Sequence, residues 1–195
     1  MRYNVSEITS LIKDRRTIYP EQFSTRKVHK ELIEALLNLA IWAPSHGLTQ
    51  PWRFSVITDE AKTTLGEELA NAYLEAIPKE SQNEVKLAKL LNRPKKASAV
   101  IALILHREEG TKISERDDFA ALACAVQNMH LGATAYGLGA FWSTPKIMNH
   151  SRLRTFLDLT PEQECVGFFY LGYPEIEWPG GQRKPIEYIT NWKNS

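Results

Sequence analysis

The sequence predicts an α+β protein in which helices outnumber strands. Several segments place apolar residues three or four positions apart, which is the spacing of an amphipathic helix. Between them lie short runs such as "AVIALIL" that are apolar at every position, which is typical of a strand covered on both faces. The 195 residues contain no internal repeat and no flexible linker, so we expect a single domain over 1–195.

The composition is that of an ordinary globular protein. The formal net charge is only +1, which provides no general attraction for nucleic acid or for an anionic membrane. The opening "MRYNVSEITS" has no apolar signal region, and the longest apolar run is too short to cross a bilayer. Neither Cys124 nor Cys165 belongs to a CxxC motif. We therefore expect a reduced, cytoplasmic protein without nucleic-acid or membrane partners.

Two helices are expected before the first strand. Residues 5–14 carry apolar side chains along one helical face, and the basic pair Arg15-Arg16 follows. A second amphipathic helix is expected from about 27 to 42, with Thr25 as candidate N-cap and Pro44 beyond its end.

The centre of the chain is expected to hold two strands separated by two helices. The alternating, β-branched stretch "WRFSVIT" predicts a strand at 52–58. Residues 59–91 are polar, rich in helix formers and interrupted near Pro78, which indicates two helices. "ASAVIALIL", at 97–105, is the strand expected to be buried on both faces.

A long helix is expected between Ser114 and Tyr136. Ser114 is followed three residues later by Asp117, a pattern similar to a capping box, and Gly137 can end the helix. Alanines on several of its faces suggest close contact with neighbours all round. Three elements complete the chain: a strand at 139–143, a helix at 151–158 and a buried strand at 165–173.

The first candidate site is the basic stretch "DRRTI". Arg15 and Arg16 offer bidentate donors and Thr17 offers a hydroxyl, the groups that a terminal phosphate needs. Alternatively, the arginines simply complement the dipole at the end of a helix. Local chemistry alone favours this alternative, because such pairs are common.

The second candidate site is the loop "APSHGLTQPW". Two prolines bound a polar stretch in which His46 and Gln50 carry both donors and acceptors, suited to the edge of a flat heteroaromatic ligand. The alternative is an ordinary turn with a capping Ser45 and an exposed His46, and the loop alone does not decide between them.

Two later stretches also carry candidate residues. "GLGAFWSTP" combines glycines that allow close backbone approach with the ring face of Trp142 and donors from Ser143 and Thr144, or it is a helix cap leading into an edge strand. "GGQRKPIE" puts Arg183 after a glycine turn, where it could reach an anion or belong to a solvated tail.

No motif indicates hydrolytic or metal chemistry. The chain has no GxGxxG, no GxxxxGK[ST] and no nucleophile elbow. Cys124 and Cys165 are expected to be small core residues rather than nucleophiles. Apart from His46, the histidines lie far apart without an acidic partner at a telling spacing, and no Cys/His cluster has zinc spacing. Hydrolytic and metal chemistry therefore have no positive support in the sequence, and we expect no metal site.

Taken together and in order, these stretches resemble the nitroreductase family of FMN-dependent oxidoreductases, particularly its small, single-domain members. The motifs are "RRTI", "APSHGLTQPWRF", "RPKKASAVIALIL", "GLGAFWSTP", "VGFFYLGYP" and a late "RKP", and they cover essentially the whole chain. The resemblance implies a central, mainly antiparallel sheet flanked by helices. It also implies an intertwined homodimer in which the segment after Tyr173 wraps onto the other subunit.

The resemblance further implies which residues bind the cofactor. Arg15, Arg16 and Thr17 would hold the FMN phosphate, and Arg183 matches a late phosphate-binding arginine. His46 and Gln50 would reach the flavin of the other subunit across the dimer interface.

The isoalloxazine ring would lie beside Trp142, Ser143 and Thr144. Members of the family often carry an arginine after this tryptophan, where the present chain has Ser143.

The implied activity is a ping-pong reaction. NADH or NADPH would give a hydride to flavin N5, and an acceptor such as a nitroaromatic or a quinone would then take the electrons. Two alternatives stay open: a different flavin reaction on the same scaffold, such as desaturation or dehalogenation, and a non-catalytic or regulatory FMN-binding protein.

Overall fold

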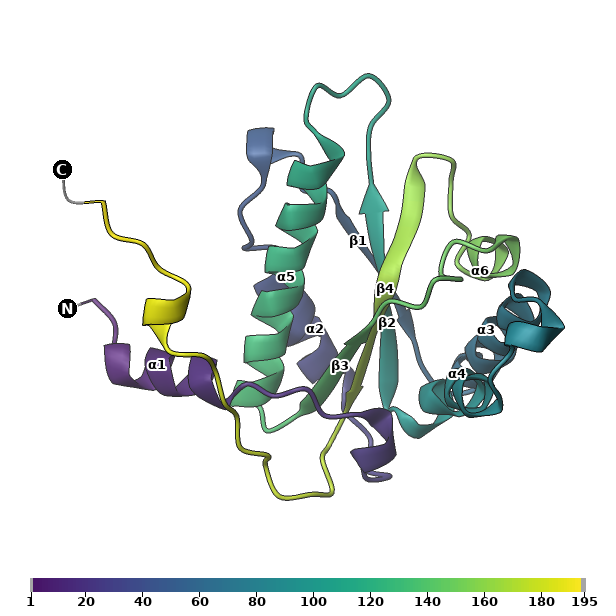
Figure 1. Ribbon diagram of the computed structural model, residues 1–195, viewed down its shortest axis with the longest axis horizontal. Helices are drawn as coiled ribbons and strands as arrows, with labels where there is room; N and C mark the ends of the chain where they lie inside the picture. The colour runs from purple at the N-terminus through teal and green to yellow at the C-terminus, as the bar shows by residue number, and fades with distance from the viewer. Residues whose placement is uncertain (1, 194–195) are drawn as a thin grey trace.

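The computed structural model describes residues 2–193, which are arranged around a four-stranded sheet (Figure 1). The strands lie in the order β1-β2-β4-β3, and each neighbouring pair is antiparallel. The strands are β1, Trp52–Ile57; β2, Ala99–His106; β3, Gly139–Ser143; and β4, Gln163–Gly172. The expected α+β fold with a mainly antiparallel sheet is confirmed.

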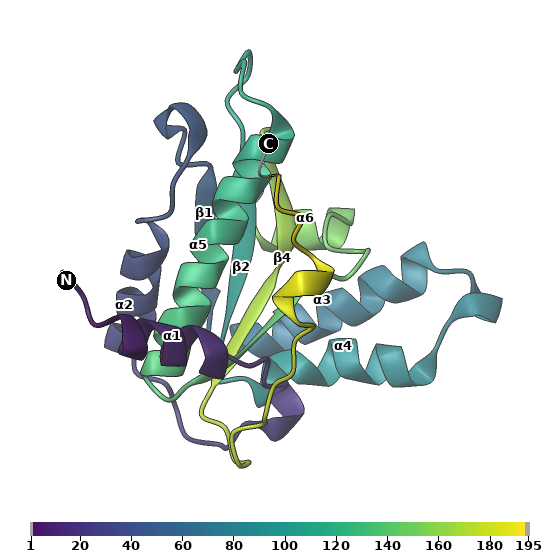
Figure 2. The same cartoon turned by 60° about the vertical axis from the view of Figure 1, so that its left-hand side comes forward.

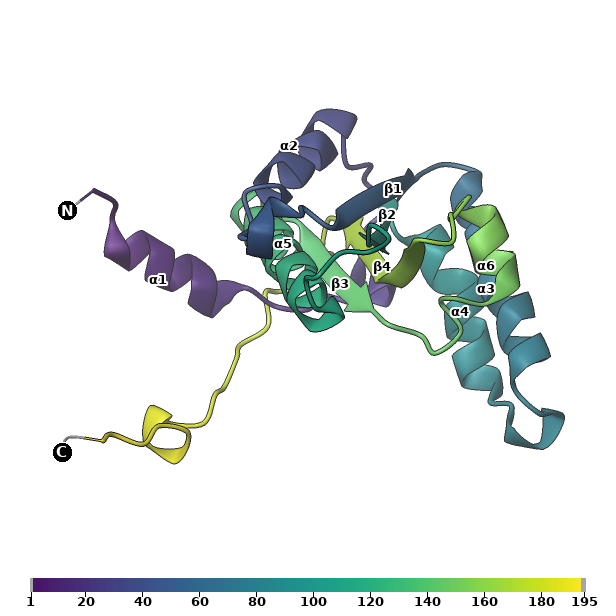
Figure 3. The ribbon, with the colours of Figure 1, turned by 90° about the horizontal axis from the view of Figure 1, so that it is seen from above.

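Helices cover both faces of this sheet (Figures 1 and 3). One face carries α2, Lys30–Ala40, and α5, Glu115–Ala135; the other carries α3, Ala61–Ala76, α4, Glu84–Lys96, and α6, Ser151–Phe156. β2 is buried from Ala99 to Leu105 because its side chains alternate between two covered faces. None of the helices within residues 2–193 is both long and apolar enough to cross a membrane.

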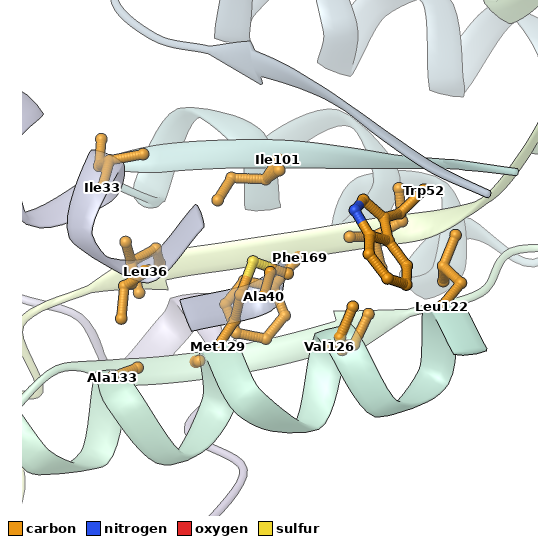
Figure 4. Packing of buried hydrophobic residues seen from close by; sticks show 14 of the residues in the cluster. Ile33, Leu36, Ala40, Trp52, Ile101, Leu122, Val126, Met129, Ala133 and Phe169 are labelled. Atoms are coloured by element: carbon orange, nitrogen blue, oxygen red, sulfur yellow. The ribbon is translucent and has the colours of Figure 1, made fainter. Parts of the chain in front are cut away.

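The core between the sheet and α5 is shown in Figure 4. Side chains three or four residues apart on α5 face the side chains that α2 and the sheet direct toward them. Burial of each Leu, Val or Met in such a layer stabilises the fold by about 1.5–3 kcal/mol. The labelled members of this layer are Ile33, Leu36, Ala40, Trp52, Ile101, Leu122, Val126, Met129, Ala133 and Phe169.

The first helix and the C-terminal segment project from one side of the body (Figures 1 and 2). α1, Val5–Asp14, buries none of its residues, and its apolar face stays open: Val5, Ile8 and Ile12 are 46–57% exposed. The segment after β4 is equally open, with four apolar side chains at least 64% exposed: Ile186, Tyr188, Ile189 and Trp192. Two apolar surfaces are therefore exposed on the single chain.

The second helix begins later than the sequence indicated. α2 starts at Lys30 with His29 at the N-cap, rather than near 27 with Thr25. The approach to the helix is held extended because the Val28 N–H donates to Ser98 Oγ at 2.6 Å. The partner lies 70 residues away, so a local capping pattern could not reveal it.

The helix before β2 ends later than the sequence indicated, because α4 runs through Pro94 to Lys96. A proline in the last turn removes only one backbone hydrogen bond, and here its ring is buried. The other expected helices and strands occur at their expected positions, with small shifts at their ends.

Candidate functional site

The segment after α1 is fixed against the edge of the sheet. Arg15 is the C-cap of α1, and Thr17 forms a parallel bridge with Ala140 of β3. The Ile18 N–H donates to the Ala140 carbonyl at 3.0 Å. These contacts hold the basic pair beside the strand that also carries Trp142.

Three arginines meet at this edge without a carboxylate partner. Within residues 2–193, no Asp or Glu oxygen lies within 4.0 Å of Arg15, Arg16 or Arg183 side-chain nitrogens. Burial lowers the pKa of Arg15, and the positive charges of Arg183 and Arg16 lower it further. A site of this kind favours an anion that would compensate the three charges.

The Arg16 side chain is oriented by backbone groups. Its Nη1 donates to the carbonyls of Lys13 at 2.5 Å and Arg15 at 2.8 Å, whereas its Nε is buried without a hydrogen-bond partner. Gly181 lies against the guanidinium, because a Cβ there would stand 2.1 Å from Arg16 Nη2. A phosphate oxygen within reach of this nitrogen would satisfy the buried donor.

His130 supports the same segment from α5. Its Nε2 lies 3.0 Å from the Arg16 carbonyl, and the residue is only 7% exposed. Burial and the charge of Arg15 lower the pKa of His130 to about 4, against hydrogen bonds with the Arg16 and Ala140 backbones that raise it. The ring is therefore neutral at pH 7, and Nε2 carries the proton that it donates to the Arg16 carbonyl. Sequence reasoning missed His130, because its partner is a carbonyl rather than an acidic side chain.

Trp142 lies in a space that a bulge and a glycine create. The β2–β4 register passes from Leu103 opposite Gly167 to Ile104 opposite Cys165. Gly167 has φ +147°, and a Cβ on it would stand 2.3 Å from Trp142 Nε1. The indole can therefore lie across β4 only because position 167 has no side chain. Ser143 is half-buried and Thr144 is exposed next to it.

The proline-bounded loop is anchored at the other end of α5 (Figure 1). His46 Nδ1 lies 3.2 Å from Asp117 Oδ2, and Thr49 Oγ1 donates to the buried Asp118 at 3.0 Å. The hydrogen bond from His46 lowers the pKa of Asp117. Gln50 has φ +44°, and its N–H donates to Ser45 Oγ at 3.3 Å.

The single chain thus brings most, but not all, of the candidate residues together. Arg15, Arg16, Thr17 and Arg183 gather near β3, which carries Trp142 and Ser143 and is followed by Thr144. His46 and Gln50 do not join them. The contacts of the two groups on α5, at Asp117 and His130, are 13 residues apart, which is about 20 Å along a helix.

A face of α5 stays open between these two groups. α1 crosses only the C-terminal end of α5 (Figure 2). Along the rest of the helix, Phe119, Ala120, Cys124 and Gln127 are exposed. Among residues 2–193, no group of three or more His, Cys, Asp or Glu side chains is arranged to hold a metal ion.

Comparisons with known proteins give a consistent result. The family model described as "Nitroreductase family" matches residues 12–173. The "Putative NAD(P)H nitroreductase YfhC" of Bacillus subtilis is 28% identical over 183 residues, covering 93% of this chain and 91% of that protein.

Solved structures agree with this assignment. A nitroreductase-like family protein from Bacillus cereus is 27% identical, with a TM-score of 0.81 over 100% of this chain and 99% of that one. The "putative nitroreductase in complex with fmn" from Desulfovibrio desulfuricans is 26% identical, with a TM-score of 0.75 over 99% of both chains. Because the family model spans most of the sequence and the fold agrees over its full length, the chain belongs to the nitroreductase family.

Proposed function

We propose that the protein is an FMN-dependent NAD(P)H oxidoreductase that works as a homodimer. In this proposal, electrons pass from NADH or NADPH through FMN to a nitroaromatic, a quinone or a similar acceptor, in a ping-pong sequence. The observation that carries it is the cluster of three arginines without carboxylate partners beside β3, in a chain of the nitroreductase family. The FMN bound by the Desulfovibrio relative supports the choice of anion.

The phosphate of FMN would be held by Arg15, Arg16, Thr17 and Arg183. The buried and unsatisfied Nε of Arg16 fits a phosphate oxygen, and the Thr17 hydroxyl adds a short-range donor. The neutral ring of His130 fixes the Arg16 backbone without adding a fourth charge to the cluster.

The isoalloxazine ring would pack beside Trp142, Ser143 and Thr144 and be completed by His46 and Gln50 of the partner subunit. The separation of about 20 Å along α5 supports this division, because the loop of one chain does not lie at its own arginines. A loop already anchored to Asp117 and Asp118 loses little conformational freedom when a ligand docks.

Three open apolar surfaces support the dimer. They are the exposed face of α1, the exposed side chains after β4 and the open face of α5. Small residues such as Ala120 and Cys124 allow a second helix to approach closely. The segment after Tyr173 is long enough to pack on a second copy, and the two unpaired cysteines fit a reducing compartment such as the cytoplasm.

In the reaction itself, bound FMN would supply the redox chemistry, accepting a hydride and passing the electrons on. The protein itself would bind and orient the cofactor. The arginines would hold the phosphate end, Trp142 would limit the ring to one side, and backbone N–H groups near the ring edge would stabilise negative charge. No side chain of the candidate site is required to transfer a proton.

The visible spectrum of the purified protein tests cofactor and reaction together. We expect a yellow dimer whose flavin absorbance is bleached by NADH or NADPH under anaerobic conditions and returns when a nitroaromatic or a quinone is added. A yellow protein that neither nucleotide bleaches would favour a non-catalytic FMN-binding protein. A colourless monomer that takes up no added FMN would refute the proposal altogether.

A further inference from the structure

A second cleft lies apart from the candidate flavin site. Its volume is about 1020 Å³, and none of the predicted FMN-binding residues lines it. Its walls come from the segment before α2, the N-terminal half of α2, the end of β1, the start of α3 and the junction of α4 with β2. The inference that follows therefore stands independently of the proposed function.

The floor of this cleft is apolar. Phe23, Val28, Ile33 and Ala97 are buried beneath it, and Val56 is 42% exposed on its wall. Sites for small organic molecules typically have volumes of about 300–1,000 Å³ and mostly apolar walls. The cleft is thus large enough for a ligand with an apolar or heteroaromatic body.

The rim of the cleft is strongly basic. Six of the lining residues are Lys or Arg and three are Asp or Glu, an excess of three positive charges in a chain whose net charge is +1. Each of the three acids has its own cation: Glu21 binds Arg93 at 2.9 Å, Asp59 binds Lys27 at 3.3 Å and Glu34 binds Lys30 at 3.4 Å.

Four cations on the rim are left without a carboxylate. Within the described part of the chain, no Asp or Glu oxygen lies within 4.0 Å of the cationic nitrogens of Arg26, Lys62, Lys95 and Lys96. The Arg26 guanidinium lies 3.8 Å above the centre of the Tyr173 ring, which orients it without neutralising it.

Helix electrostatics explains only part of this pattern. The last turn of α4 attracts cations through its dipole, and Lys62 Nζ donates to the Ala97 carbonyl at 2.5 Å. Arg26 does not belong to α4. It lies in the segment before α2, on a different wall of the same cleft. Cations that converge from separate elements over an apolar floor match an anionic group attached to an apolar body.

We propose that this cleft binds an organic phosphate: a nucleotide-like molecule whose ring system rests on the apolar floor and whose phosphates face Arg26, Lys95 and Lys96. The guanidinium offers paired donors and the two lysines act as point charges. This ligand occupies a site separate from the flavin and from any substrate that reacts at the flavin.

Calorimetric titration of the protein as purified, with its flavin, provides the test. The probes are ATP, adenosine and inorganic triphosphate. We expect ATP to bind more tightly than either part alone, because the floor and the rim each contribute. Triphosphate that binds as tightly as ATP would overturn the role of the apolar floor, and absence of ATP binding up to millimolar concentration would overturn the proposal.

Charge variants locate the site. In Lys95→Gln/Lys96→Gln we expect the Kd for ATP to rise about tenfold, since two phosphate contacts are lost. The matched control is Lys79→Gln/Lys89→Gln, which removes two exposed lysines outside the cleft and should change the Kd less than about twofold. Equal weakening in both variants would indicate unspecific charge attraction and contradict the site.

A third variant separates this cleft from the flavin site. Arg16→Ala should leave ATP binding unchanged, whereas it disturbs the proposed FMN phosphate site. ATP binding that is lost in Arg16→Ala but kept in Lys95→Gln/Lys96→Gln would assign the nucleotide to the flavin site and refute the proposal. Thermal unfolding of each variant verifies that the fold is intact.

Discussion

The two ends of the candidate flavin site are built in different ways. The arginine segment is held by the sheet, through Thr17 and Ala140, and by the buried ring of His130. The loop with His46 and Gln50 is attached to the first turn of α5 and lies exposed. Within the described part of the chain, the predicted phosphate-binding residues therefore lie together, whereas the loop lies apart from them.

In the proposed dimer, this difference corresponds to a cofactor site that is divided between two subunits. A charged cluster such as Arg15, Arg16 and Arg183 needs rigid support, because like charges repel one another until an anion arrives. A loop that contacts a neutral ring edge needs only to be stiff. The left-handed backbone of Leu48 and Gln50 shows that this stiffness is accompanied by local strain.

The largest effect on FMN binding is expected from a substitution at the arginine end. In Arg16→Ala the phosphate loses a charge-assisted partner, so we expect FMN to bind about 10- to 100-fold more weakly. Flavin per chain after dialysis, and fluorescence titration of the apoprotein, measure this. Lys89→Ala, which removes an exposed cation on α4, is the control and should retain its flavin. Full retention in Arg16→Ala would contradict the arginine cluster as the phosphate site.

The contribution of His130, which supports the arginine end, to the stability of the fold is expected to depend on pH. The pKa of His130 is about 4 in the folded chain and about 6.5 when exposed, so the unfolded chain takes up the proton first as pH falls. The stability that the neutral ring contributes is present above pH 6.5 and is lost as the pH falls from 6.5 to 4, by up to about 3 kcal/mol.

His130→Gln isolates this contribution, since its amide does not titrate and keeps a donor for the Arg16 carbonyl. Urea unfolding at a series of pH values should show a shallower loss of stability for His130→Gln than for the wild type between pH 6.5 and 4. Parallel curves for the two proteins would mean that the His130 ring does not remain neutral in the folded chain.

The space for Trp142 is expected to depend on Gly167. In Gly167→Ala the new Cβ would meet Trp142 Nε1 and the Ser143 carbonyl on a backbone that side chains rarely adopt, so we expect a loss of about 1–3 kcal/mol. Gly110→Ala is the matched control, because Gly110 also has a positive φ but nothing within 4 Å of its Cβ. Only Gly167→Ala should also shift the tryptophan fluorescence, and identical effects of the two variants would exclude the contact with Trp142.

Much of the fold could be predicted from local patterns in the sequence. The capping serine Ser114 accepts the Asp117 N–H as expected, and Gly137 adopts the left-handed conformation that ends α5. Continuous apolarity correctly indicated that β2 is covered on both faces. Such features depend on neighbours in the chain, which the sequence displays directly.

Signals that depend on distant partners were not visible in the sequence. The start of α2 is set by Ser98, the Arg16 carbonyl is held by His130, and the position of Trp142 depends on Gly167. The four stretches that suggested a site became specific only as an ordered set, because each alone also fits a turn, a cap or a tail. The second basic cleft was missed for the same reason, since its cations come from separate elements.

The smallest effect on FMN binding is expected from a substitution in the loop. This substitution nevertheless gives the sharpest test of whether the site is divided between two subunits. Gln50→Ala removes an uncharged hydrogen bond to the ring, so FMN should bind only about 3- to 10-fold more weakly. In a mixed dimer of one Arg16→Ala chain and one Gln50→Ala chain, a shared site leaves one cleft with both changes and the other with neither. Such a dimer should keep one FMN with wild-type affinity, measured by titration of differently tagged, co-purified chains. If each chain built its own site, both clefts would be weakened and no wild-type site would remain.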